Sequence, residues 1–240
     1  MSKKIFLAAA FIAIIACCAS CVKYMFSING NGVLATSEKT VSAFEKINVA
    51  GTAKVRFHAS EDEYRVVVTV DENLYEYVEV FTKNNALNIR TKHGYSCSFT
   101  TFQVDVYCPS LRGVSMSGSG SFEGFDKITT SNFEATVSGS GKVNGTVECE
   151  KFTAKVSGSG RITIAGNSHD ANIDISGSGS FGGSDFEIFT AAVGISGSGS
   201  ANVWVTEYLK ARISGSGVVN YRGEPRVETN ISGSGRVRKQ

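Results

Sequence analysis

The chain has 240 residues, of which 42% are hydrophobic, and carries a formal net charge of +2. It is long enough to bury a core, and its nearly balanced charge gives no electrostatic argument for nucleic-acid binding. The 26 glycines against 2 prolines indicate repeated close approaches of the backbone rather than disordered linkers, which usually contain both residues.

Residues 1–20 have the pattern of an export signal. Lys3 and Lys4 precede an apolar run from Ile5 to Ala16, which is shorter than the about 20 residues that a membrane-spanning helix needs. Small residues and cysteines follow, as in the lipobox of bacterial lipoproteins. We expect cleavage after residue 20, which would remove two lysines and leave 22 basic and 22 acidic residues.

Cys21 is the expected lipid acceptor, because residues 19–21 (Ala-Ser-Cys) resemble the looser Ser-Cys form of the lipobox. Cys17 is the alternative, since residues 14–17 (Ile-Ile-Ala-Cys) fit the more usual consensus. A plain secretory signal or an uncleaved anchor stays open. Each of these puts the folded part outside the cytoplasm. The lipid would attach it to the membrane of the cell envelope, at the outer membrane on the periplasmic side or at the cell surface.

Residues 21–43 are predicted to be a tether, because they are polar and contain glycine after Phe26. Residues 44–115 contain runs of β-branched and aromatic residues, such as 66–70 and 104–107, that are typical of strands. We expect this region to begin the fold as a cap, since an uncovered end of a stacked β-structure exposes unpaired strand edges.

Three cysteines would remain beside an acylated Cys21, an odd number outside a reducing compartment. Cys97 and Cys108 are close enough in sequence to bridge two adjacent strands. Cys149 lies on the same alternating row as Val143 and Val147, which predicts a buried and unreactive thiol. No pair of cysteines has zinc-finger spacing, so neither a metal site nor a cofactor is predicted.

An internal repeat determines the architecture predicted for residues 116–240. Its element is Ser-Gly-Ser-Gly within an apolar frame, and 18 to 21 residues separate one copy from the next. The copies begin at Ser117, Ser138, Ser157, Ser176, Ser196, Ser214 and Ser232. The apolar frame distinguishes them from a flexible Gly-Ser linker.

The alternation of residues within each repeat predicts strands with one apolar face. In an extended strand the apolar flanks and both glycines would face inward, and the serines outward. Inward glycines would mark a close approach of opposing walls or a sharp bend. Stacked copies would bury a continuous interior. The predicted fold is therefore all-β: a β-solenoid of 18–21-residue coils over residues 44–240, with irregular N-terminal coils (44–115) acting as a cap.

These features resemble the putative auto-transporter adhesin, head GIN domain family, whose members are exported proteins abundant in Bacteroidetes. The resemblance covers about residues 44–235, and its carriers besides the Ser-Gly-Ser-Gly coils are Phe44–Val49, Val104–Tyr107, Pro109 and Leu111. It implies a β-helix-like solenoid with an adhesive or scaffold role. It assigns no catalytic residues.

The expected function is therefore non-catalytic binding at the cell envelope, by multivalent contact with a glycan or with a host or envelope protein. A polysaccharide-active, pectinase-like enzyme is the main rival, and it would need neighbouring carboxylates on one wall. The outward position before each repeat is occupied by Thr136, Lys155, Asp174, Gly194, Arg212 and Asn230. This column stacks no two carboxylates, and His58, His93 and His169 lack a triad-like context. A purely structural periplasmic rod is the third hypothesis.

Trp204 is the predicted ligand contact, because Val203 and Val205 would face inward and leave the indole outward. Exposed tryptophan suits sugar stacking or a protein contact, unless a neighbouring loop covers it. An exposed last coil could also pair two chains end to end as a homo-oligomer.

Overall fold

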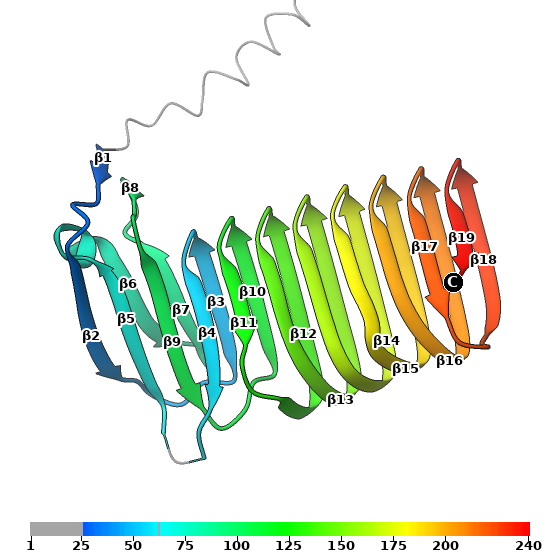
Figure 1. The fold of residues 1–240 in the computed structure, drawn as a ribbon, viewed down its shortest axis with the longest axis horizontal. Helices are drawn as coiled ribbons and strands as arrows, with labels where there is room; N and C mark the ends of the chain where they lie inside the picture. The colour runs from blue at the N-terminus through cyan, green and yellow to red at the C-terminus, as the bar shows by residue number, and fades with distance from the viewer. Residues whose placement is uncertain (1–25, 62) are drawn as a thin grey trace, which may run out of the picture.

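The computed structural model describes residues 26–61 and 63–240. The predicted export signal and both candidate lipidation sites, Cys17 and Cys21, lie outside the described residues. The chain forms a β-solenoid of about seven turns, which confirms the predicted fold class (Figure 1). Within the described ranges, no helix is long and apolar enough to cross a membrane.

About three quarters of the described residues lie in strands. In chain order the elements are β1 (Phe26–Asn29), β2 (Leu34–Thr40), β3 (Lys46–Gly51), β4 (Lys54–Ala59), β5 (Arg65–Asp71), the 3-10 helix η2 (Glu72–Tyr77), β6 (Val78–Lys83), β7 (Ala86–Thr91), β8 (Tyr95–Ser98), β9 (Phe102–Cys108), β10 (Gly113–Gly118), β11 (Ser121–Gly124), β12 (Ile128–Gly139), β13 (Lys142–Gly158), β14 (Arg161–Gly177), β15 (Ser180–Gly197), β16 (Ser200–Gly215), β17 (Val218–Arg222), β18 (Arg226–Gly233) and β19 (Arg236–Lys239).

Each repeat forms one coil that pairs in parallel with the next. β13 and β14 pair from Lys142 opposite Arg161 to Gly158 opposite Gly177. The tetrapeptides stay opposite one another from β12 to β18, so the strand ends line up along one edge of the solenoid (Figure 1). This register keeps the apolar residues of every coil on the interior face.

Each strand ends at the first glycine of its tetrapeptide, where the chain turns sharply, and this corrects part of the predicted pattern. Its first glycine lies at the surface with positive φ, +109° at Gly158, whereas the second, such as Gly160, is buried. The alternation rule assumes an extended backbone, and the positive φ reverses the chain. A Cβ on Gly160 would collide with Cγ1 of Val137 across the interior. The second glycine therefore marks a close approach of two walls, as predicted.

The turn divides each coil into two outward surfaces. We call the residues directly before each tetrapeptide, such as 151–156, the first wall. The residues directly after it, such as 161–166, form the second wall. Both serines of each tetrapeptide are exposed, as expected from the sequence. Between the walls, buried apolar side chains form one continuous core from Phe44 to Val219.

The N-terminal coils are not stacked in chain order. β3 pairs in parallel with β7 on one side and β10 on the other, and β4 lies between β9 and β11 in the same way. Gly51, with φ +117°, stands opposite Gly118 of the first tetrapeptide. Residues 50–53 therefore occupy a tetrapeptide position that their sequence, Ala-Gly-Thr-Ala, does not reveal.

Antiparallel strands close this end of the solenoid, which confirms the predicted cap. β2 pairs with β5, β5 with β9, and β6 with β7.

Both β1 and β2 lie within residues 21–43, so the prediction of a tether is wrong for residues 26–40. Pairing with β5 satisfies the backbone groups along one edge of β2, and the exposed positions of β2 account for its polar composition.

A buried carboxylate holds the cap together. Asp71, at the end of β5, is fully buried and accepts hydrogen bonds from the backbone N–H groups of Gly32 (3.0 Å) and Thr100 (2.8 Å). The Thr100 hydroxyl donates a further bond at 2.5 Å. These bonds, led by that of the Thr100 hydroxyl, lower the pKa of Asp71 from 3.8 to about 2.

The cap is therefore expected to weaken in acid. Because the pKa of Asp71 is lower in the folded state, its contribution to stability is complete above about pH 4 and is lost as the pH falls toward 2. We expect Asp71→Asn to lower the melting temperature at pH 6 and to flatten its fall between pH 4 and pH 2. Thermal unfolding across this range tests the prediction, with the exposed Asp185→Asn as control. Parallel profiles for wild type and Asp71→Asn would contradict it.

Candidate functional site

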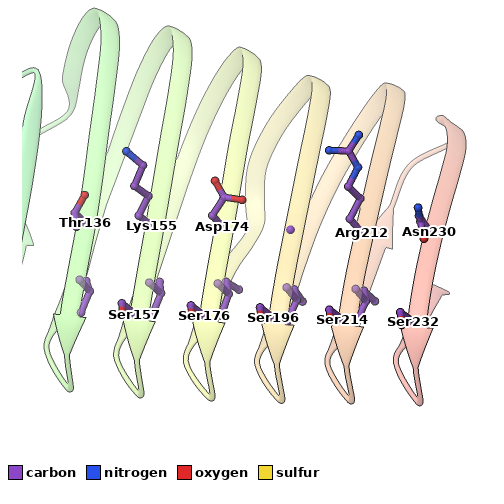
Figure 2. A pocket seen from close by; sticks show the side chains of 16 residues that line it. Thr136, Lys155, Ser157, Asp174, Ser176, Ser196, Arg212, Ser214, Asn230 and Ser232 are labelled. Atoms are coloured by element: carbon purple, nitrogen blue, oxygen red, sulfur yellow. The ribbon is translucent and has the colours of Figure 1, made fainter.

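A groove of about 510 Å³ runs along the first wall, across the coils from β12 to β18 (Figure 2). It lies between two outward columns of side chains. One column contains Thr136, Lys155, Asp174, Gly194, Arg212 and Asn230, and the other Ser157, Ser176, Ser196, Ser214 and Ser232. Five coil spacings of about 4.8 Å give it a length of roughly 24 Å. We call it the serine groove.

Buried β-branched residues keep both columns turned outward. Val156 and Ile175, which stand between the columns, are each only 2% exposed. Successive side chains of a strand point to opposite faces, so these residues fill the core and leave strand backbone between the columns. The groove is thus a consequence of the same alternation that builds the coil.

The first column is interrupted at Gly194, which has no side chain. Its register partners are Asp174 on one neighbouring coil and Arg212 on the other. Asn172 Nδ2 donates a hydrogen bond to Asp174 Oδ2 at 3.0 Å, and Asp174 Oδ1 would lie 2.7 Å from a Cβ placed on Gly194. The gap therefore lies between an anion and a cation, and it suits a ligand group that both donates and accepts hydrogen bonds.

The two cations of the groove differ in their partners. Lys155 Nζ lies 3.0 Å from Glu134 Oε1, and this hydrogen bond lowers the pKa of Glu134. Arg212 forms no salt bridge with any residue that the structure describes. Its planar N–H donors are therefore available to an acceptor on a ligand.

The serine groove differs from the active site of most glycoside hydrolases in its number of carboxylates. Among the residues that line it, Asp174 is the one carboxylate, whereas most glycoside hydrolases use two that flank the scissile bond. In residues 26–61 and 63–240, no group of three or more His, Cys, Asp and Glu residues is placed to hold a metal ion.

Trp204 faces outward between the buried Val203 and Val205, as the alternation predicts. It stands on the second wall, so the structure does not bring it to the serine groove. The Arg222 guanidinium, on the next coil, lies 4.1 Å from the ring centroid. One face of the indole is therefore covered by a cation–π contact, which the sequence did not indicate.

An outward cluster near the cap was missed from the sequence. Asp105 on β9 accepts two hydrogen bonds from Arg56 on β4, at 2.6 and 2.8 Å, and His58 Nε2 lies 3.3 Å away. Burial opposes ionisation of Asp105, but the bonds from Arg56, Gln103 and His58 outweigh it and lower its pKa. Residues 55–58 and 104–107 both alternate between apolar and polar positions. This alternation indicates that Arg56 and Asp105 are neighbours only when the pairing of β4 with β9 is known.

Planar side chains continue this cluster along the second wall. The His58 ring stacks between Tyr107, at a centroid distance of 4.8 Å, and Phe125, at 5.2 Å. Arg65 covers the Tyr107 ring at 3.9 Å. Because this stack uses both faces of the His58 ring, the histidine serves as a spacer between aromatic rings rather than as the base of a triad.

The three described cysteines are free thiols. The suggested Cys97–Cys108 bridge is wrong, because Cys97 lies in the small β1–β8 sheet and Cys108 in the solenoid sheet. Burial raises the pKa of Cys108 to about 12 and also raises that of Cys149. Cys149 is half-buried against the core, and its thiol donates to Ser168 Oγ at 3.6 Å. Both thiols are poorly ionised and therefore weak nucleophiles.

Known proteins share this architecture. A putative adhesin from Bacteroides fragilis matches with a TM-score of 0.84 and 22% identity, over 89% of this chain and 100% of the other, and shows the fold. Two Parabacteroides distasonis structures match over 89% of this chain. One, a putative lipid binding protein, has 26% identity, TM-score 0.75 and 99% coverage of its own chain. The other, a putative adhesin, has 27% identity, a TM-score of 0.74 and 100% coverage of its own chain.

No curated protein matches the chain significantly. The family model for the putative auto-transporter adhesin, head GIN domain, matches residues 43–225, which is most of the chain and nearly all of the solenoid. The chain therefore belongs to the putative auto-transporter adhesin, head GIN domain family.

Proposed function

We propose that the protein is a non-catalytic adhesin, exported and anchored by a lipid in the cell envelope, that binds its ligand along the serine groove. The observation that carries the proposal is the repetition of the groove: the same two columns recur on consecutive coils. A polymer with a repeating unit can contact several coils at once, and linked contacts raise the overall affinity well above that of one contact.

The chemistry of the groove indicates the class of ligand. Serine hydroxyls line one side, and the gap at Gly194 lies between Asp174 and Arg212. These groups suit a glycan, or a host or envelope protein, that presents hydroxyl and acceptor oxygens at regular intervals. The names of the structural relatives, putative adhesins and a putative lipid binding protein, agree with a binding role rather than with catalysis.

A variant that fills the gap tests the proposal. Gly194→Gln puts a side chain into the groove, and the exposed Asp174 carboxylate can rotate away from it. We expect wild-type protein to bind saturably to at least one member of a glycan and host-matrix array. Gly194→Gln should weaken this binding at least 10-fold, because the ligand would lose its contacts on neighbouring coils.

Ser180→Gln on the second wall is the matched control, since it adds the same side chain away from the groove. Unchanged binding by this control, with an unchanged melting temperature for both variants, would support the proposal. Equal loss in both variants would place binding elsewhere. Absence of binding to the whole array would favour the purely structural rod.

A further inference from the structure

The second wall carries a separate hollow of about 450 Å³. It extends from the β11 coil to the β15 coil, and small residues form its surface, among them Gly124, Gly145, Thr146, Ala165, Gly182 and Ser184. We call it the second-wall trough. Neither Trp204 nor the serine groove contributes to its lining.

An aromatic residue stands beyond each end of the trough. Phe125 directly follows Gly124 and is 55% exposed, and Trp204 stands on β16, next to the β15 coil. Both are on the second wall, and four coil spacings of about 4.8 Å separate them by roughly 19 Å. This span is far longer than one sugar ring and fits an oligosaccharide.

Another side chain covers the face of each ring that points away from the trough. His58 stacks on Phe125 with an interplanar angle of 3°, and β4, which carries His58, lies on the cap side of β11. Arg222 covers the Trp204 ring from β17, which lies on the other side of β16 from β15. These contacts therefore cover the face of each ring that points away from the trough, and on the trough side Glu187 of β15 is the register partner of Trp204.

The charges of the trough select among glycans. Glu123 and Asp185 are its ionisable lining residues, and neither lysine nor arginine lines it. Carboxylates accept hydrogen bonds from sugar hydroxyls but repel anionic polymers. Asn144 and Thr163 add polar groups that bond to hydroxyls.

We propose that the second-wall trough binds a neutral oligosaccharide, whose terminal rings stack on Phe125 and Trp204 while its hydroxyl groups contact the polar edge. Small floor residues leave room for the sugar rings, and the backed aromatic side chains lose little conformational freedom on binding. This site lies on the opposite wall from the serine groove and does not depend on it.

The single tryptophan of the chain provides a direct measurement, because Trp204 is the only source of indole fluorescence. The purified protein is titrated with neutral gluco-, manno-, xylo- and galacto-oligosaccharides and with oligogalacturonate as an anionic counterpart. We expect at least one neutral oligosaccharide to shift the emission saturably, and oligogalacturonate to leave it unchanged. Failure of every neutral sugar, or a response to oligogalacturonate alone, would overturn the proposal.

Variants locate the site by calorimetric titration of the same sugar. Trp204→Ala and Phe125→Ala should each weaken binding about 10-fold or more. Ala165→Arg, which fills the floor without touching either aromatic ring, should abolish it. Phe189→Ala removes an exposed aromatic ring elsewhere on β15 and should have no effect. Equal weakening by Phe189→Ala, or full binding by Ala165→Arg, would refute the site.

Gly194→Gln distinguishes binding in the second-wall trough from binding in the serine groove. It should retain neutral oligosaccharide binding in full, because the serine groove is on the first wall. Loss of that binding in Gly194→Gln would show that the sugar occupies the serine groove and would overturn the trough as its site.

Discussion

Replacing Gly160 with valine is expected to lower the free energy of unfolding by about 3 kcal/mol. A Cβ at this position would overlap Cγ1 of Val137 and would also lie 2.8 Å from the carbonyl oxygen of Gly141. The second of these neighbours is backbone within the stacked tetrapeptides, so it cannot move without disturbing the adjacent coil. The branched side chain therefore has no space on either side.

Urea unfolding followed by circular dichroism measures this loss. Ser157→Val is the matched control, because it introduces the same side chain at an exposed strand position, where β-branched residues are favoured. Its free energy of unfolding should stay within about 0.5 kcal/mol of wild type. A Gly160→Val protein as stable as the control would contradict the close contact between the walls.

The regular coils could be predicted from sequence because their information is local. Each tetrapeptide is flanked by alternating apolar residues, and copies 18 to 21 residues apart can stack in only one register without exposing their apolar face. The outward column from Thr136 to Asn230 followed directly from this alternation. The inward placement of the first glycine was wrong because its positive φ breaks the extended geometry on which alternation rests.

The order of the N-terminal coils could not be predicted in the same way. β3 pairs with β7 and β10, which come much later in the chain, so Ile47 lies between Leu87 and Val114. These contacts depend on non-local pairing and on apolar runs that would fit several registers. Residues 50–53 kept only one glycine of the tetrapeptide, so the repeat search could not find their coil.

In the candidate sites, too, local features could be predicted from the sequence, and contacts between coils could not. The outward direction of Trp204 is a local property, and the structure confirms it. The cation–π contact with Arg222, the gap between Asp174 and Arg212, and the stacking of His58 between two aromatic rings all join different coils. They became visible only when the register of neighbouring coils was known, because no single segment contains both partners.

Replacing Phe152 with alanine is expected to lower the free energy of unfolding by about 4 kcal/mol. The ring is 1% exposed and packs between Phe133, at a centroid distance of 6.3 Å, and Phe186, at 4.9 Å. Its register partner on the next coil is the small Ala171, so Phe186 fills the space beside it. Loss of the ring would leave a cavity that neither neighbouring coil can fill with its own side chains.

The position of the cavity also determines how the protein should unfold. In a solenoid each coil is stabilised chiefly by its two neighbours, so a defect in β13 weakens the coupling of the coils on both sides. We expect the urea transition of Phe152→Ala to move to lower concentration and to broaden, with a smaller slope. Phe189→Ala, which removes an exposed ring from β15, should lower stability by about 1 kcal/mol or less without broadening. A transition that shifts without broadening would show that the coils unfold as one cooperative unit despite their one-dimensional packing.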